Sequence, residues 1–293
     1  MISADVSQLA NVLGAKLIGS GEVVVTGSVE TDSRLVTTGS IFFAKPGEQA
    51  DGHDFVADAK SRGAVVAVVE HPVDVDIAQL VVSSSVDALG VLASWLIGEL
   101  KSAGKLKVVG ITGSNGKTTT KNMLRAILSK VGNTIAPIES FNNRVGAPIS
   151  ILRADQNTDF LVVEMGAEGL GSIAYLAKMA QPDVAVILKV GMAHAGEFGG
   201  LEVTAKIKGE LAEAVGENSQ LVLNADDGLV AAMKNRTKAK VLWFGTSSEA
   251  QFWASEISLS KAGTSFVLNW PDGEKTPIQL SILGEHHIMN ALA

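Results

Sequence analysis

The 293-residue sequence contains no cysteine, so it forms neither disulfide bonds nor thiolate metal sites. It has no excess of basic residues: the formal net charge of -7 provides no basic field for nucleic acid, and no block of like charges indicates a charged tail. Long hydrophobic runs are also lacking, because apolar stretches such as Leu89–Ile97 are interrupted and too short to cross a bilayer. The composition therefore argues against a disulfide scaffold, a nucleic-acid-binding protein and a membrane-spanning protein.

The first residues, MISADVSQLA, lack the basic segment and apolar run of a secretory signal. The absence of cysteine fits a reducing compartment. We therefore expect a cytoplasmic, monomeric protein that has no membrane insertion and no nucleic-acid partner. The length predicts two domains, each large enough for its own core.

One stretch carries a specific chemistry, residues 107–121 with the sequence KVVGITGSNGKTTTK. A short β-branched strand leads into a glycine-rich turn at Gly113–Gly116, and Lys117 then opens a helix. Glycines let backbone N–H groups close around an anion, and the start of a helix favours negative charge. In such a phosphate-binding loop Lys117 reaches the β- and γ-phosphates, and the Thr118 hydroxyl binds Mg²⁺.

The glycine spacing of this loop is irregular. Five residues separate Gly110 from Gly116, whereas the general motif has four. A glycine-rich turn without a ligand is therefore an alternative, although the strand before and the helix after the turn favour phosphate binding.

The apolar pattern of the first part predicts a small α/β domain over residues 1–84. It contains a helix at 6–13, strands at 23–29, 40–47 and 64–70, and a helix at 54–61. Residues 85–105 are expected to connect this domain to the next, through a helix at 86–100 and a polar boundary at 102–105.

Residues 106–293 are expected to form a domain like those of phosphate-loop ATPases. Strands are predicted at 107–112, 133–136, 159–165, 183–190, 220–224 and 239–244, and helices at 118–130, 170–180, 201–215 and 226–235. The near-continuous apolar strands indicate a mostly parallel sheet covered on both faces. Alternation over 251–283, around a turn at 271–273, predicts an appended antiparallel hairpin, and a further helix begins near 286.

Two candidate side chains follow predicted parallel strands, where ligands bind in such sheets. Glu164 ends one strand, and a carboxylate there holds Mg²⁺ opposite a phosphate loop more often than it is merely solvated. His194 follows the strand that ends at Val190, and a metal or catalytic role is as well supported as that of an ordinary polar residue.

Other polar residues have simpler explanations. Lys206 and Lys208 fit a solvated helix face, on which Glu202 and Glu210 pair with Lys206 at four-residue spacing. The adjacent Asn142 and Asn143 are typical of a turn. A helix N-terminus explains the three polar residues after strand 220–224, which are Asn224, Asp226 and Asp227.

Several motifs stand in the order found in the Mur ligases of peptidoglycan synthesis: TGSNGKTTTK, FNNRVGAP, VVEMGA, AH…EFG with AKIKGEL downstream, LNADD and GEHHIMNALA. The sequence resembles this family over essentially its whole length, and its loop, TGxxGKTT, accounts for the irregular glycine spacing. The segment TDSRLVTTGSIFFAKPGEQADGHDF is similar to the family's uridine-nucleotide-binding domain. FNN followed by G-x-P favours the members that join D-alanyl-D-alanine to UDP-N-acetylmuramoyl-tripeptide.

The resemblance implies an ATP-dependent amide-bond-forming ligase that proceeds through an acyl phosphate, with residues 1–84 binding the UDP-linked peptide and 106–293 binding ATP. It implies ATP contacts at Gly113, Ser114, Asn115, Gly116, Lys117, Thr118, Thr119 and Asn290. It implies Mg²⁺ ligands at Thr118, Glu164, His194 and a carbamylated Lys208. It further implies catalytic roles for Lys117, His194 and Lys208, and substrate contacts at Ser33, Arg34, Asn142 and Asn143.

Two departures from the family pattern bear on these expectations. His287 stands where the family usually has an asparagine, so no site role is assigned to it. The family also has a C-terminal domain that binds the incoming amino acid or dipeptide, and we expect this chain to be a fragment without it, unable to complete the reaction alone. A non-catalytic nucleotide-binding module, or a related ligase with another amino acid acceptor, is the alternative.

Overall fold

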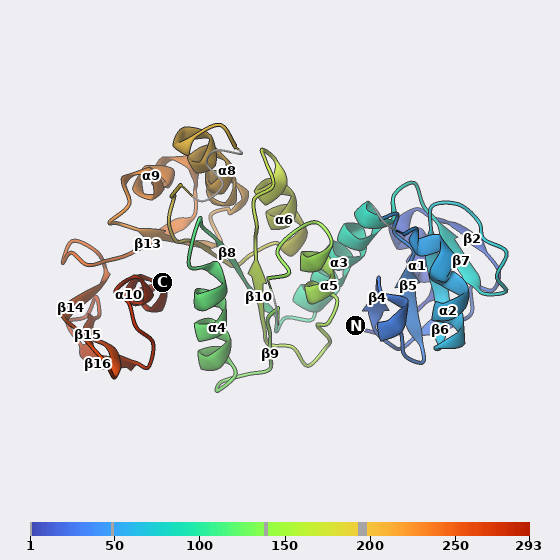
Figure 1. The fold of residues 1–293 in the computed structure, drawn as a ribbon, viewed down its shortest axis with the longest axis horizontal. Helices are drawn as coiled ribbons and strands as arrows, with labels where there is room; N and C mark the ends of the chain where they lie inside the picture. The colour runs from blue at the N-terminus through green and yellow to red at the C-terminus, as the bar shows by residue number, and fades with distance from the viewer. Residues whose placement is uncertain (1, 48–49, 138–139, 193–197) are drawn as a thin grey trace. The chain divides into compact units, whose positions relative to one another are not determined.

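A computed structural model describes residues 2–47, 50–137, 140–192 and 198–293 (Figure 1). The chain divides into two compact units. The first contains residues 1–106 together with 144–159, and the second contains 107–143 together with 160–293. The chain therefore crosses between the units three times, whereas the sequence predicted a single boundary.

The first unit is built on a five-stranded sheet in the order β2-β7-β6-β5-β4, parallel except between β2 and β7. Its strands are β2 (Lys16–Ile18), β4 (Val29–Glu30), β5 (Ser40–Phe43), β6 (Ala64–Val69) and β7 (Ala78–Val81), and β1 (Ala4–Asp5) pairs separately with β3 (Val24–Val25). Its helices are α1 (Val6–Leu13), α2 (Val56–Ser61), α3 (Ser85–Ser102) and α5 (Gly146–Ile151), with single 3-10 turns η1 (Ser33–Leu35) and η2 (Gly52–Phe55). The predicted helix at 6–13 is confirmed, and β2, β7 and α5 are additions.

The helix expected to be a connector, α3, belongs to the first unit. Ser84 caps it by accepting the Asp87 N–H at 3.1 Å, and its apolar side chains, including Leu89 and Leu96, are buried. It packs against α1 and α5, and Arg144 donates to the Asp87 carboxylate at 2.7 Å. The segment 144–159 joins the first unit through these contacts.

The second unit contains a nine-stranded sheet in the order β16-β15-β14-β13-β12-β11-β8-β10-β9. Its strands are β8 (Lys107–Thr112), β9 (Thr134–Ile135), β10 (Phe160–Glu164), β11 (Val184–Ile187), β12 (Gln220–Asn224), β13 (Lys240–Gly245), β14 (Phe252–Ser260), β15 (Gly263–Asn269) and β16 (Lys275–Leu280). Neighbours from β9 to β14 are parallel, and β14, β15 and β16 are antiparallel. The predicted mostly parallel sheet is confirmed, and the appended hairpin is part of a three-stranded antiparallel element.

Helices cover both faces of this sheet, since the consecutive residues Leu161, Val162 and Val163 are all buried although they point to alternate faces. The helices are α4 (Lys117–Leu128), α6 (Ser172–Ala180), α8 (Leu201–Ala214), α9 (Gly228–Ala231) continued by η3 (Ala232–Arg236), and α10 (His286–Leu292). Figure 1 shows α10 beside α4, and both helices pack on a core that includes Phe244 and Ile288.

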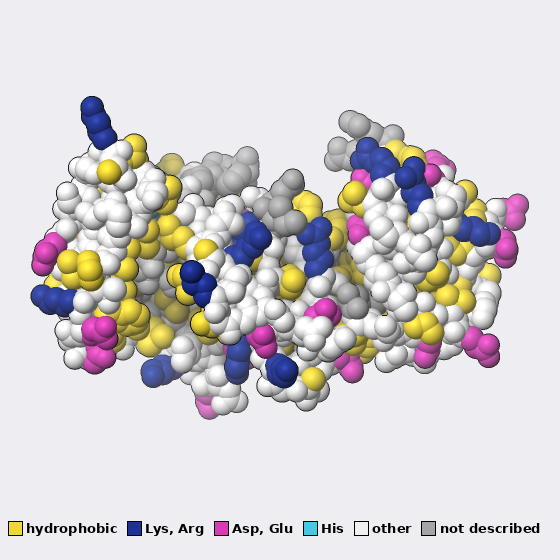
Figure 2. Space-filling view, turned by 90° about the horizontal axis from the view of Figure 1, so that it is seen from below, with side chains coloured by type: hydrophobic (Ala, Val, Ile, Leu, Met, Phe, Trp, Pro, Cys, Tyr) yellow, Lys and Arg dark blue, Asp and Glu magenta, His cyan; other side chains and the backbone are white. Residues whose placement is uncertain are grey.

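None of the described helices is long and apolar enough to cross a membrane. Figure 2 shows basic and acidic side chains interspersed over the face that it presents. This mixture agrees with the modest net charge of -7, because neither sign of charge dominates that face.

Candidate functional site

The glycine-rich turn lies where the sheet changes the direction of its connections. Strand β8 has β10 and β9 on one side and β11 and β12 on the other, and ligands of open α/β sheets bind at such a point. Gly116 precedes α4 with φ of 89°, which side chains with a Cβ rarely adopt. A Cβ at Gly116 would also overlap the amide oxygen of Asn290. Glycine is therefore required where the loop enters the helix.

Two lysines from different helices carry positive charge at this loop. The Lys117 ammonium donates to the Gly113 carbonyl at 3.0 Å; partial burial lowers its pKa, and the Glu164 charge partly opposes this. Lys208 of α8 is 4% exposed, and burial, followed by the positive charge of Lys117, lowers its pKa to about 8. Because the charge of Lys117 disfavours that of Lys208, an anion beside the two ammonium groups would be favoured.

Glu164, at the end of β10, is 1% exposed and held by two donors. The Thr118 hydroxyl donates to one carboxylate oxygen at 3.0 Å, and the Asn142 amide donates to the other at 2.9 Å. The hydroxyl and carboxylate oxygens are hard ligands that suit Mg²⁺, which also takes ligands from substrate phosphates. No group of three or more acidic, histidine or cysteine side chains that could hold a metal occurs among the described residues, and His194 lies outside them.

Ser114 forms hydrogen bonds within the protein, and its contact with ATP stays a prediction. Its N–H donates to the Lys189 carbonyl at 2.8 Å, and its hydroxyl accepts the Gly191 N–H at 2.9 Å. Both groups are used inside the protein, so Ser114 joins the loop to the segment after β11. Asn115 is exposed at the tip of the turn, and Thr119 lies in the first turn of α4.

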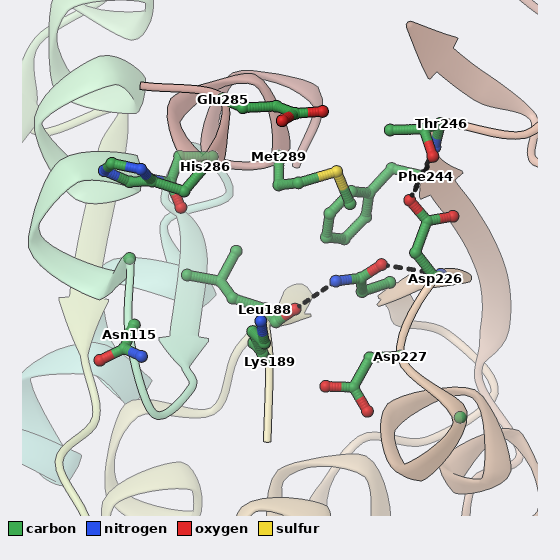
Figure 3. A pocket seen from close by; sticks show the side chains of 14 residues that line it. Asn115, Leu188, Lys189, Asp226, Asp227, Phe244, Thr246, Glu285, His286 and Met289 are labelled. Atoms are coloured by element: carbon green, nitrogen blue, oxygen red, sulfur yellow. Dashed lines mark hydrogen bonds between the residues drawn. The ribbon is translucent and has the colours of Figure 1, made fainter. Parts of the chain in front are cut away.

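A cavity of about 630 Å³ lies next to the loop, at the carboxyl ends of β11, β12 and β13 (Figure 3). It is lined by Asn115, Gly116, Leu188, Lys189, Asn224, Asp226, Asp227, Gly228, Phe244, Thr246, Glu285, His286, Met289 and Asn290. Figure 3 shows the Phe244 ring next to the Met289 side chain, with polar groups elsewhere around the cavity. An apolar wall with a few convergent polar groups is typical of small-ligand sites, and the volume suits a nucleoside.

The acidic residues of this cavity also hold its walls together. Asp227 caps α9 by accepting the Leu229 N–H at 3.0 Å, as the sequence predicted, and its other oxygen accepts the Val190 N–H at 2.9 Å. Asp226 accepts both the N–H and the hydroxyl of Thr246 (Figure 3). These bonds join the ends of β11, β12 and β13, so the cavity is preorganised.

Most residues of the cavity were not predicted from the sequence. The additional lining residues with functional side chains are Lys189, Phe244, Thr246, Glu285, His286 and Met289. For Lys189, Phe244 and Thr246 the available signal was position, because they lie at or just after the ends of predicted parallel strands, as Glu164 does. His286 faces the cavity, whereas the buried Nδ1 of His287 makes no hydrogen bond to the described residues.

The predicted substrate residues lie in different surroundings. Ser33 is 6% exposed in η1, whereas the Arg34 side chain is 78% exposed and pairs with Asp32 at 2.6 Å. Asn142 contacts Glu164, and Asn143 is exposed at the end of the second unit's first segment. Within the second unit, Asn142 is thus placed beside the carboxylate that also accepts from Thr118.

The helix that carries Lys208 is contacted by Arg236 at the next residue, Gly209. The Arg236 guanidinium donates to the Ala205 and Lys206 carbonyls at 3.3 and 3.0 Å and pairs with Glu213. A Cβ at Gly209 would overlap this guanidinium. Gly209 therefore makes room for the contact between η3 and α8.

Gly209→Ala is expected to lower the free energy of unfolding by about 1–3 kcal/mol, because the added methyl displaces Arg236. Gly98→Ala in α3 is the matched control: nothing lies within 4 Å of its Cβ position, so this change is expected to raise stability by about 0.5–1 kcal/mol. Urea unfolding of the two variants measures both effects. Equal changes at the two sites would show that Arg236 does not require glycine.

The loop after β8, the carboxylate that ends β10 and the adjoining cavity together define a nucleotide-binding protein of the phosphate-loop class. Comparison with known families is more specific. The Mur ligase middle domain matches residues 111–293, and the Mur ligase family, catalytic domain, matches residues 26–91. The chain belongs to the Mur ligase family.

Its relatives include UDP-N-acetylmuramoyl-tripeptide--D-alanyl-D-alanine ligases. That of Mycobacterium tuberculosis is 39% identical over 319 residues, covering 100% of this chain and 62% of the relative. Solved structures that are similar include MurF from Acinetobacter baumannii, with a TM-score of 0.91 at 33% identity over 100% of this chain and 64% of that chain. MurF ligase from Thermotoga maritima in complex with ADP has a TM-score of 0.81 at 32% identity over 92% and 62%. The chain spans 62–64% of the length of these curated relatives.

Proposed function

We propose that this chain contains the ATP-binding and UDP-substrate-binding parts of a ligase that joins D-alanyl-D-alanine to UDP-N-acetylmuramoyl-tripeptide in peptidoglycan precursor synthesis. The observation that carries the proposal is the convergence of Lys117, Thr118 and Glu164 beside a nucleoside-sized cavity. Relatives at 32–39% identity that carry this ligase name over the whole chain support the choice of substrates.

ATP is proposed to occupy the cavity with its base against Phe244 and Met289 and its phosphates on the backbone of the loop. The ADP in the Thermotoga maritima structure supports this nucleotide. Asn290 contacts the loop at Gly116 and lines the same cavity, which supports the proposal that it contacts the nucleotide between its base and its phosphates.

In the proposed reaction, a terminal carboxylate oxygen of the tripeptide attacks the γ-phosphorus of ATP, and the bond to ADP breaks. The amine of D-alanyl-D-alanine then attacks the acyl phosphate carbon, and phosphate leaves as the amine loses its proton. Lys117 neutralises the charge that develops on the phosphates, and the loop keeps them in line with the carboxylate. Thr118 and Glu164 would hold Mg²⁺, which supplies further charge neutralisation when bound.

Lys208 is proposed to be carbamylated. Its amine adds to CO₂ and releases a proton, which turns a buried cation into a carboxylate-bearing anion. The lowered pKa of Lys208, about 8, supports this step, because the neutral amine is the form that adds CO₂. The resulting anion would relieve the repulsion with Lys117 and, with His194, supply ligands for a second Mg²⁺.

The first unit is proposed to bind the UDP part of the substrate, with Ser33 and Arg34 in contact with it. The exposed guanidinium of Arg34 suits a diphosphate, since planar fork geometry recognises phosphate oxygens. Asn142 and Asn143 are proposed to meet the peptide end of the same substrate near Glu164. Because ATP is a cytoplasmic metabolite, we place the reaction in the cytoplasm, and we propose that the enzyme acts as a monomer.

A test of this function separates its two half-reactions. Incubation with labelled ADP, ATP and UDP-N-acetylmuramoyl-tripeptide is expected to give exchange of label between the nucleotides, which reports acyl phosphate formation without the dipeptide. Addition of D-alanyl-D-alanine is expected to give the UDP-linked pentapeptide by mass spectrometry. Nucleotide binding without any exchange would favour a non-catalytic module, and a product formed only with another amine would favour a different acceptor.

A further inference from the structure

Residues 208–210 of α8 face three different parts of the second unit, because successive residues of a helix point about 100° apart. Lys208 faces the charge of Lys117, and Gly209 gives room to Arg236. Glu210 points to a third element, the start of α6. The sequence-based expectation that Glu210 pairs with Lys206 on the surface of α8 is therefore wrong.

The Glu210 carboxylate binds the N-terminus of α6 with both oxygens. One accepts the Gly171 N–H at 2.7 Å and the other accepts the Ala174 N–H at 3.0 Å. The first N–H groups of a helix lack partners inside the helix, and the helix dipole favours an anion there. Glu210 is 8% exposed, and no lysine, arginine or histidine within the described part of the chain forms an ion pair with it. Its charge is therefore stabilised by backbone N–H groups.

Helix α6 depends on this distant residue for its cap. Its N-cap position is Gly171, which has no side chain to accept a hydrogen bond. By contrast, α1, α3 and α9 are capped by their own residues Asp5, Ser84 and Asp227. The capping group of α6 thus comes from α8, two residues after Lys208 along the chain.

The segment that ends at this cap begins at the candidate site. It leaves β10 directly after Glu164, and the Gly166 N–H donates to the Asn142 carbonyl at 2.7 Å. The chain then reaches the capped Gly171, so residues 165–171 are held at both ends. Glu210 consequently links the helix that carries Lys208 to the segment that starts at Glu164.

We propose that Glu210 is a positioning residue, which places Lys208 relative to Glu164 and Lys117 by holding the N-terminus of α6 against α8. The proposal deepens the proposed function, since it gives a role in the same site to a residue that touches neither nucleotide nor peptide. A shift of α8 away from α6 would move Lys208 out of its buried position beside the loop.

The central test compares Glu210→Gln with the wild-type protein. Glutamine has the size of glutamate but no charge. Its NH₂ group is a donor, so it would face either the Gly171 or the Ala174 N–H without forming a hydrogen bond. Hydrogen exchange at the Gly171 and Ala174 amides is expected to accelerate about tenfold or more. Labelling of Lys208 by an amine reagent at fixed pH is expected to increase by a similar factor relative to the exposed Lys206 of the same helix, an internal reference.

Activity adds a second readout when the rate is expressed per molecule of folded protein, counted by titration with ATP. In Glu210→Gln, kcat for the nucleotide exchange reaction is expected to fall about tenfold or more, whereas the KM for ATP stays unchanged, because Glu210 does not line the nucleotide cavity. Glu213→Gln is the matched control: this glutamate is on the same helix but pairs with Arg236, and its change is expected to leave Lys208 labelling unaltered.

Two results would overturn the proposal. Unchanged exchange at Gly171 and Ala174 would show that the cap is dispensable. Faster exchange with unchanged Lys208 labelling and unchanged kcat would show a helix cap that positions nothing. Glu210→Asp, which keeps the charge but reaches less far, is expected to give intermediate effects and decides the matter if the glutamine variant does not fold. Labelling needs no turnover, so failure of the proposed ligase reaction in the wild type is seen separately.

Discussion

Replacement of Lys117 by methionine is expected to reduce phosphoryl transfer from ATP about a thousandfold or more and to weaken ATP binding. Methionine keeps a long apolar stem but removes the ammonium that lies over the loop, 3.0 Å from the Gly113 carbonyl. No other residue of the loop itself carries a positive charge, so the γ-phosphate charge would be left to more distant groups. Titration calorimetry with ATP and ADP release with the UDP-linked tripeptide measure the two effects.

Lys178→Met is the control for this change, because Lys178 is exposed near the end of α6. It removes the same charge from the second unit without touching the loop, and both binding and turnover are expected to stay at the wild-type level. Retention of full nucleotide affinity by Lys117→Met would refute the role given to Lys117.

Lys208→Ala is expected to lower ligase activity at least about a hundredfold. A short carboxylic acid such as acetate is expected to restore part of the activity, because it brings a carboxylate into the space that the lysine leaves. Bicarbonate is expected to restore none, since the variant has no amine to carbamylate. Intact-mass analysis of the wild-type protein, without acid treatment, is expected to show the addition of one CO₂ at Lys208.

The pH dependence of this modification follows from the lowered pKa of Lys208, about 8, for which burial is the main cause. At about pH 7.5 roughly a quarter of such a lysine is neutral, against about one part in a thousand for an ordinary lysine. Carbamylation at constant dissolved CO₂ is therefore expected to increase as pH rises from about 7 to 8.5. A fully active Lys208→Ala enzyme, or carbamylation that decreases over this interval, would contradict the assignment.

Much of the second unit was predictable from sequence because its signals are local. Strand β8 and strand β12 have the predicted bounds, as does α1 in the first unit, since each is a compact run with clear periodicity and turn residues at its ends. Helix α5 was missed because its six residues, Gly146–Ile151, are too few to show helical periodicity. The antiparallel element was placed correctly but was predicted as a two-stranded hairpin. The reason is that the two residues between β14 and β15, Lys261 and Ala262, are neither glycine nor proline and gave no turn signal.

The candidate site divides in the same way. The phosphate loop and Glu164 follow directly from one motif and one strand end, and the structure brings Thr118 and Glu164 within 3.0 Å. The cavity could not be assembled from sequence, since Phe244 and Met289 are 45 residues apart and meet only because α10 packs beside β13. Position after a parallel strand is the one signal that would have found part of it.

By itself the sequence determined a phosphate-binding loop between a strand and a helix, a mostly parallel covered sheet and membership of a recognisable family. These features depend on residues adjacent in the chain, whose propensities and spacing act before any tertiary contact forms. Only the tertiary structure decided which partner each polar group found: Glu210 turned to the N–H groups of α6 instead of to Lys206, and residues 144–159 joined the first unit through α3. The reason is physical. A buried polar group takes the strongest partner that packing brings within reach, and packing joins segments that the order of the chain keeps apart.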